Sequence, residues 1–164
     1  MSNLHIPVGS AEHQQYSQLA DQGDVIRVAP GIYMDATAEF ERVFNQEFGR
    51  LLHALTGGSF RLSHRSALSP TPTSQIICVT VPARSAAEEK HIKSKTILLL
   101  DGPEDPEVEK LEWASESIPR SSVELALAEC TQDRRGAYRS SILDREELEE
   151  QIYRHQDQID PDRL

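Results

Sequence analysis

The adjacent residues Ser63 and His64 place a hydroxyl nucleophile next to an imidazole base. A serine activated by a histidine is the arrangement that many acyl-transfer enzymes use. Residues 59–63 have the composition of a short strand, however, and neighbouring residues of a strand point to opposite faces. No G-x-S-x-G sequence surrounds any serine. We therefore expect Ser63, His64 and Arg65 to be structural, with hydrogen bonds that fix the junction between a long helix and the sheet. Contact of these residues with a partner is the alternative.

The sequence offers few residues that could bind a metal or a cofactor. Glu88 and His91 are three residues apart and supply one carboxylate and one imidazole, which is too few for a metal site. Cys78 and Cys130 are 52 residues apart, and no C-x-x-C sequence is present. Both cysteines stand among apolar neighbours, which predicts buried thiols. Because Walker A and G-x-G-x-x-G sequences are also absent, we expect no metal, no cofactor and no enzymatic activity.

The charge of −10 is confined to one part of the chain. Residues 1–100 are balanced, and the whole acidic excess lies in residues 101–164. This distribution argues against a protein that coats nucleic acid and against binding to anionic membranes. A charged helix face that is merely solvated is one interpretation of the acids, and a surface for a basic protein partner is the other. The acidic residues expected at such a surface are Glu146, Glu147, Glu149, Glu150, Asp105 and Glu107.

The secondary structure that would position these groups follows from hydrophobic periodicity and end signals. Strands are predicted where β-branched and apolar residues cluster, at residues 24–28, 32–34, 59–63, 75–81, 91–100 and 111–113. Helices are predicted where apolar residues recur at helical spacing, at residues 11–22, 37–55, 121–131 and 144–158. Ser10 is the expected cap of the first helix, and Ser121–Glu124 and Asp144–Glu147 have capping-box spacing. Residues 83–90 are expected to be a loop.

These elements predict an α+β fold, in which a small mixed or antiparallel sheet packs against the long central helix and two C-terminal helices. Residues 1–35 would form an N-terminal arm, a short helix and a wing-like hairpin. Residues 36–164 would form an α+β domain whose final third is acidic. One stripe of the last helix consists of Leu148, Ile152, His155 and Ile159. This stripe can pack on its own domain or on a second copy of the chain, so the sequence leaves the oligomeric state open.

An alternative function uses the N-terminal part. A helix followed by a hairpin resembles the end of a winged helix, which binds DNA. The residues that would contact DNA are Gln14, Gln15, Gln18 and Arg27. No Lys or Arg lies between residues 11 and 22, so the anchoring of phosphates would be weak.

The order of several short motifs resembles a known family. The motifs are VIRVAPGIY (25–33), FRLSHRSAL (60–68), SPTP (69–72), ICVTVP (77–82), IPRSSVELALAE (118–129) and DREELEE (144–150). Their succession resembles the AbiEi-like antitoxins of type IV toxin–antitoxin systems and, more closely, the N-terminal regulatory region of some bacterial Fic proteins. The resemblance implies a regulatory module with a truncated winged helix. The Fic motif H-P-F-x-x-G-N is absent, so the resemblance does not extend to AMP transfer.

The resemblance and the acidic C-terminal part together predict a regulatory binding protein of a toxin–antitoxin, phage-defence or counter-defence system. Such a protein would contact a basic protein partner, for example as the inhibitor of a CRISPR effector or nuclease. A DNA-binding repressor or antitoxin that uses the wing-like segment is the alternative. The N-terminus lacks the features of an export signal, and the longest apolar run, residues 97–100, is too short to cross a bilayer. We therefore expect a cytoplasmic protein.

Overall fold

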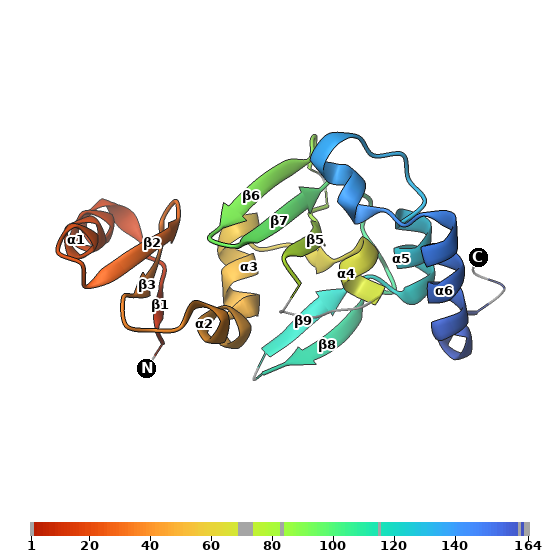
Figure 1. Ribbon diagram of the computed structural model, residues 1–164, viewed down its shortest axis with the longest axis horizontal. Helices are drawn as coiled ribbons and strands as arrows, with labels where there is room; N and C mark the ends of the chain where they lie inside the picture. Colours follow the sequence, from red (N-terminus) through yellow and green to blue (C-terminus); the bar gives the residue numbers. More distant parts are fainter. Residues whose placement is uncertain (1, 69–73, 83, 115, 161, 163–164) are drawn as a thin grey trace.

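Two β-sheets and the helices around them form the α+β fold that the sequence predicts (Figure 1). The structure is a computed structural model and describes residues 2–68, 74–82, 84–114, 116–160 and 162. The strands are β1 (Leu4–His5), β2 (Val25–Ala29), β3 (Ile32–Asp35), β4 (Arg61–Leu62), β5 (Ile76–Thr80), β6 (Glu88–Ile92), β7 (Lys95–Leu100), β8 (Glu109–Trp113) and β9 (Glu116–Arg120). The helices are α1 (Gly9–Asp21), α2 (Phe40–Gln46), α3 (Phe48–Thr56), α4 (His64–Leu68), α5 (Val123–Glu129) and α6 (Arg145–Arg154), with 3-10 turns η1 (Gly136–Ser141) and η2 (Gln156–Gln158). No helix in these residues is long and apolar enough to cross a membrane.

The larger sheet is mixed and has the strand order β6-β7-β5-β4-β9-β8. Strand β5 is parallel to β7, and β4 is parallel to β9, while the other neighbours are antiparallel. The edge strands β6 and β8 are rich in charged residues, which protects exposed edges from pairing with other chains. Because its residues are mostly charged, β6 has no apolar run that would predict a strand. Residues 83–90 were therefore wrongly predicted as a loop throughout, and residues 91–100 form the end of β6, a turn and β7 rather than one strand.

The N-terminal unit is a sheet of order β1-β3-β2 with α1 packed on it. The predicted hairpin is present, and the aromatic ring of Tyr16 on α1 lies 5.2 Å from the ring of His5 and 5.6 Å from that of Tyr33. The prediction that Ser10 caps α1 is wrong. The N-cap is Val8, whose backbone N–H donates to the Glu12 carboxylate at 2.9 Å.

The predicted central helix is divided into α2 and α3 at Glu47. In one continuous helix the Gly49 N–H would donate to the Asn45 carbonyl. Instead the Gly49 N–H donates to the Glu116 carboxylate at 2.8 Å, and the Asn45 carbonyl accepts from the Trp113 indole at 2.9 Å. The β8–β9 hairpin therefore provides other partners for both the N–H and the carbonyl of one helical hydrogen bond. A Cβ on residue 49 would lie 2.6 Å from the Glu116 carboxylate, so a larger residue would displace this carboxylate from its hydrogen bond.

One hydrophobic core connects the two sheets. It runs from Leu4 and Met34 of the N-terminal sheet through Phe44 and Leu52 to Val79 of the larger sheet. Residues 1–35 and 36–164 therefore share a core. A second, smaller core joins α4, α5 and α6.

Candidate functional site

The terminal helix α6 carries most of the acids that the sequence selected, and local signals fix where it begins. The Asp144 carboxylate accepts from the Glu147 N–H at 2.8 Å, and the Glu147 carboxylate accepts from the Asp144 N–H at 3.0 Å. This is the predicted capping box, which supplies partners for two backbone donors at the helix start. Leu148 and Ile159 pack on the second core. Ile152 was expected beside them but is 42% exposed, and Gln151 lies on the partly buried side instead.

Removal of the cap tests this assignment. We expect Asp144→Ala to lower the free energy of unfolding by about 1 kcal/mol, because a backbone N–H of the first turn loses its acceptor. Urea unfolding measures the effect, and the backbone amides of α6 should exchange with solvent faster. Ser10→Ala is the matched control, since Ser10 does not cap α1, and it should change stability by less than about 0.5 kcal/mol. An equal loss in the two variants would contradict the capping box.

The outward face of α6 forms what we call the acidic stripe: Glu146, Glu149, Glu150 and Tyr153. Their spacing of three, four and seven residues places these side chains on one face of the helix. Tyr153 is 74% exposed and is the most exposed aromatic residue in the described part of the chain. Glu149 pairs with Arg145 at 3.0 Å, and Glu150 pairs with Arg154 at 2.6 Å. Ion pairs this exposed contribute little, about 0 to 1 kcal/mol, so the cations of a partner can replace them.

The other acids chosen from the sequence have structural contacts. Glu147 belongs to the capping box and also binds Arg65 of α4 at 3.1 Å. The Asp105 carboxylate accepts from the backbone N–H of Ser122 at 3.1 Å and from that of Glu107 at 2.9 Å. Asp105 therefore shapes the loop before β8 and holds it to the start of α5, while Glu107 contributes its backbone N–H to the loop. This also corrects the predicted cap of α5, which is Ser122 and not Ser121.

A buried polar cluster surrounds Ser63 and His64. The Glu129 carboxylate of α5 accepts from the Arg61 guanidinium of β4 at 3.1 Å, from the His64 N–H at 3.4 Å and from the Thr80 hydroxyl at 3.4 Å. The side chains of Arg61 and Glu129 are each only 3% exposed. A buried ion pair of this kind requires full hydrogen bonding, because neither charge is solvated. The sequence did not indicate this pair, since 68 residues separate its members and the two motifs that contain them give no sign that they meet.

Ser63 and His64 are in contact, so the prediction that they point to opposite faces of a strand is wrong. Ser63 follows β4 and His64 begins α4 with a positive φ of 52°, so the two residues do not alternate as in a strand. The His64 ring nitrogen Nδ1 lies 2.9 Å from the Ser63 hydroxyl. The nearest Glu129 oxygen is 3.9 Å from the same nitrogen, whereas a catalytic triad needs the acid on the other one. Both residues are at most 1% exposed, so a substrate has no access to the hydroxyl.

Burial sets the chemistry of the titratable groups in this region. Burial, together with the nearby cation of Arg134, lowers the pKa of His64 to about 4, so the imidazole is neutral at pH 7. Burial raises the pKa of Cys78 to about 11 and that of Cys130 to about 12. The prediction of buried free thiols is confirmed. These raised pKa values make both thiols poor nucleophiles.

Arg65 joins α4 to the C-terminal part. Its guanidinium donates to the Ser140 carbonyl at 3.4 Å and to the Glu147 carboxylate at 3.1 Å. With Ser63 and His64 bonded inside the buried cluster, these three residues connect the sheet to α5 and α6. The expected junction with the long helix 37–55 is therefore wrong.

The N-terminal residues proposed for DNA contact lie at the opposite end of the molecule from α6 (Figure 1). Gln14, Gln15 and Gln18 are exposed on α1, and Arg27 is exposed on β2. Helix α1 carries acidic residues and no Lys or Arg. Glu88 and His91 lie on strand β6, and no group of three or more His, Cys, Asp or Glu in the described residues is placed to hold a metal ion.

Comparison with known proteins gives no relative: no family model and no curated protein matches this chain.

Proposed function

We propose that this chain is a non-enzymatic regulatory binding protein that acts in the cytoplasm by contact between its acidic stripe and a basic protein partner. The observation that carries the proposal is the exposed Tyr153 ring beside three outward carboxylates. Tyrosine is enriched at the energetic centres of protein interfaces, because it buries a large rigid ring and keeps a polar tip. A ring of this size left in solvent gains stabilisation when a partner covers it.

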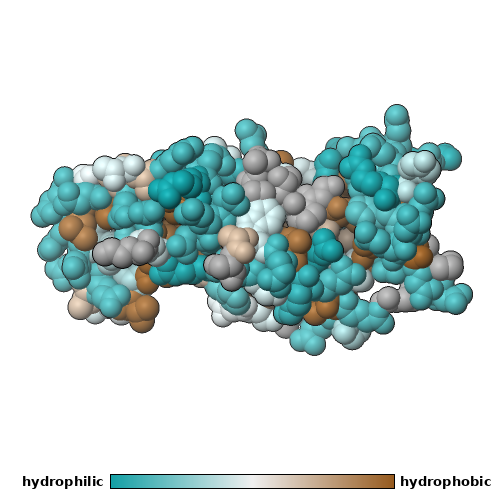
Figure 2. Space-filling view, turned by 90° about the horizontal axis from the view of Figure 1, so that it is seen from below, coloured by the Kyte–Doolittle hydropathy of each residue, from teal (hydrophilic) through white to brown (hydrophobic). Residues whose placement is uncertain are grey.

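Electrostatics favours a basic partner. The net charge of −10 arises entirely from residues 101–164, which include the acidic stripe. A field of this sign accelerates encounter with a cationic surface, by about 10-fold to 1,000-fold at low salt. On the face shown in Figure 2, hydrophobic residues form small separate patches among hydrophilic ones. Charge with a single aromatic anchor is therefore better supported than a broad apolar interface.

The antitoxin-like motifs support a toxin–antitoxin, phage-defence or counter-defence setting. In such systems the basic partner would be a nucleic-acid-handling enzyme, such as a nuclease or a CRISPR effector, since the surface that holds phosphates carries clustered Lys and Arg. Burial of Ser63 and His64 also supports a binding role over a catalytic one, because the hydroxyl and the imidazole are closed to solvent. DNA binding by α1 and β2 has less support, because Arg27 is accompanied there by the acids Asp21 and Asp24.

Affinity capture from a bacterial host tests the proposal. The wild-type chain should retain a basic protein at low salt and release it at high salt. The charge reversal Glu146→Lys/Glu149→Lys/Glu150→Lys should abolish retention, and Tyr153→Ala should weaken it at least about 10-fold, the range of an interface hot spot. The control Asp21→Lys/Asp24→Lys/Glu39→Lys makes the same change in net charge at exposed residues distant from α6.

Two results would contradict the proposal. One is retention of the partner by the stripe variant to the same degree as by the control. The other is a gel shift with promoter DNA that persists near physiological salt while no protein is retained, which would favour the repressor instead.

A further inference from the structure

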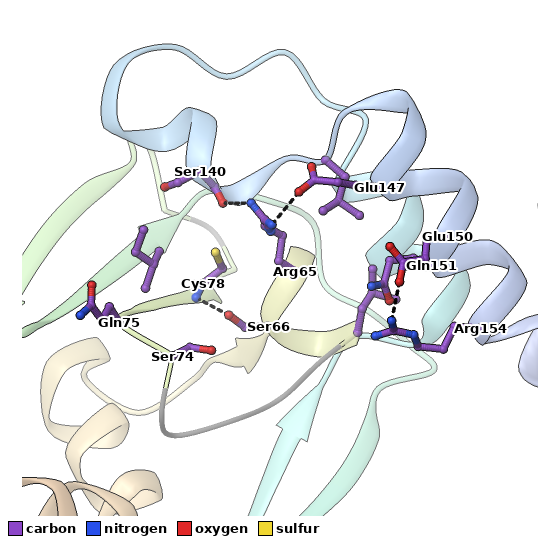
Figure 3. A pocket seen from close by; sticks show the side chains of 13 residues that line it. Arg65, Ser66, Ser74, Gln75, Cys78, Ser140, Glu147, Glu150, Gln151 and Arg154 are labelled. Carbon is purple, nitrogen blue, oxygen red and sulfur yellow. Dashed lines mark hydrogen bonds and ion pairs between the residues drawn. The ribbon is translucent and has the colours of Figure 1, made fainter.

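A groove of about 620 Å³ lies between α4, the start of β5 and α6 (Figure 3). Gln75 borders it just before β5, Cys78 from β5, Arg65 from α4, and Gln151 and Arg154 from α6. Its volume falls within the range of about 300 to 1,000 Å³ that ligand sites occupy. It flanks the acidic stripe, and Glu150 belongs to both. Apart from Glu150, the residues of this groove have no part in the proposed function.

Among the described residues, one backbone position of β5 has no hydrogen-bond partner on this side. The Gln75 carbonyl accepts from Thr96 of β7, whereas the Cys78 N–H donates to Ser66 and the Cys78 carbonyl accepts from Ser63. Alternate residues of a strand direct their polar backbone groups to the same side. Ile76 therefore directs its N–H and carbonyl to the side of α4, away from β7. No described residue bonds either group, because β4 pairs only with the far half of β5, at Val79 and Thr80.

The walls of the groove are balanced in charge. Arg65 is paired with Glu147 at 3.1 Å, and Arg154 is paired with Glu150 at 2.6 Å. Two cations and two carboxylates disfavour a phosphate or any other ligand of strong single charge. They suit an uncharged segment whose polar groups can bond along the walls.

Two further groups lack partners in the groove. The Ile76 side chain is 40% exposed, although it belongs to a strand of the central sheet. The Gln151 carbonyl oxygen Oε1 is buried, and no described residue donates to it. This oxygen is closed to solvent, so a ligand in the groove reaches it when the Gln151 side chain rotates toward the groove. An unsatisfied buried acceptor costs about 1 to 3 kcal/mol, which such a hydrogen bond would recover.

We propose that this groove binds an extended, uncharged polypeptide segment that pairs with the backbone of Ile76. The segment would add as a short strand beside β5, place one apolar side chain on Ile76 and donate a hydrogen bond to Gln151 Oε1. Addition of a strand to an open sheet edge is a common mode of peptide recognition, in which the backbone bonds supply affinity. The segment can belong to the partner of the acidic stripe, but binding in the groove does not depend on the stripe.

A random peptide library displayed on phage, selected against the full chain, supplies the probe. Peptides that are enriched should be apolar and uncharged, and fluorescence anisotropy gives their Kd. Ile76→Pro removes the N–H that faces the groove and also replaces the isoleucine side chain, and proline is tolerated at the first residue of a strand. We expect it to weaken binding about 10-fold, the size of one backbone hydrogen bond at its upper range. Ile76→Ala keeps the N–H and tests the apolar contact, and Gln151→Met removes the acceptor with little change in volume.

Each outcome decides the proposal. Weaker binding in both Ile76→Pro and Gln151→Met, with an unchanged midpoint of thermal unfolding, supports it. If Ile76→Pro does not fold, Gln151→Met and Ile76→Ala decide alone. No enrichment, or equal affinity in wild type and Gln151→Met, overturns it. Peptides that lose affinity only in Glu146→Lys/Glu149→Lys bind the acidic stripe, and this result also overturns the groove proposal. If instead the acidic stripe binds no partner, the proposed function fails while peptide binding in the groove stays unchanged.

Discussion

Glu129→Gln is expected to lower the free energy of unfolding by about 3 to 5 kcal/mol, the largest effect of any single substitution proposed for this protein. The substitution changes one atom type and leaves the volume of the side chain nearly constant. It removes the negative charge that faces the Arg61 guanidinium at 3.1 Å. Arg61 keeps its bonds to Ser121 at 2.8 Å and to the Pro103 carbonyl at 2.6 Å, but its charge stays buried without a counter-charge.

Urea unfolding measures this loss, and Glu149→Gln provides the matched control. Glu149 forms an ion pair with Arg145 that is largely exposed, so the same chemical change there should cost less than about 1 kcal/mol. The double variant Arg61→Met/Glu129→Gln should recover part of the loss, because it removes the unpaired cation. A loss of under about 1 kcal/mol in Glu129→Gln would show that the buried pair does not hold β4 to α5.

The second large effect is a loss of stability in mild acid that originates at His64. The pKa of His64 is lowered from its ordinary value of 6.5 to about 4, first by burial and then by the Arg134 and Arg61 cations. Between these two pH values the unfolded chain binds a proton at His64 and the folded chain does not. The free energy of unfolding should therefore fall by about 3 kcal/mol from this residue as the pH is lowered from 6.5 to 4.

His64→Asn tests this origin. Asparagine tolerates the positive φ of 52° at this position, and it does not titrate. The variant should lose less stability than the wild type between pH 6.5 and 4, while the pH dependence above pH 7 should be the same in both. Urea unfolding at a series of pH values gives the comparison. Parallel curves over the whole range would contradict this origin, because they would mean that folding does not lower the pKa of His64.

Local patterns predicted the parts of the fold that depend on neighbouring residues. The Asp144–Glu147 capping box needs residues three apart, and the sequence located it correctly. Apolar residues at helical spacing correctly indicated helix within residues 37–55. Phe40, Phe44 and Phe48 belong to this pattern, and their rings lie 5.4 to 5.7 Å apart along one side. Short-range geometry is set by residues that the sequence itself places together.

Distant contacts account for what the sequence could not show. The break at Glu47 depends on Trp113 and Glu116, which lie more than 60 residues further along the chain. The buried Arg61–Glu129 pair spans a similar distance. Within the candidate site, the three glutamates of the acidic stripe followed from charge density, but Tyr153 was missed. A helical projection of residues 145–154 would have found it, since Tyr153 is three and four residues after Glu150 and Glu149.

The association rate with the captured partner tests the central claim most directly. It should be measured for purified proteins at about 0.05 M and about 0.5 M salt, because screening shortens the reach of the acidic field over this range. For the wild type and for Asp21→Lys/Asp24→Lys/Glu39→Lys, the rate constant should fall at least about 10-fold from low to high salt. For Glu146→Lys/Glu149→Lys/Glu150→Lys, the rate at low salt should already equal the slow high-salt rate. If the two triple variants associate at the same rate at both salt concentrations, the acidic stripe is a solvated surface and not the site of contact.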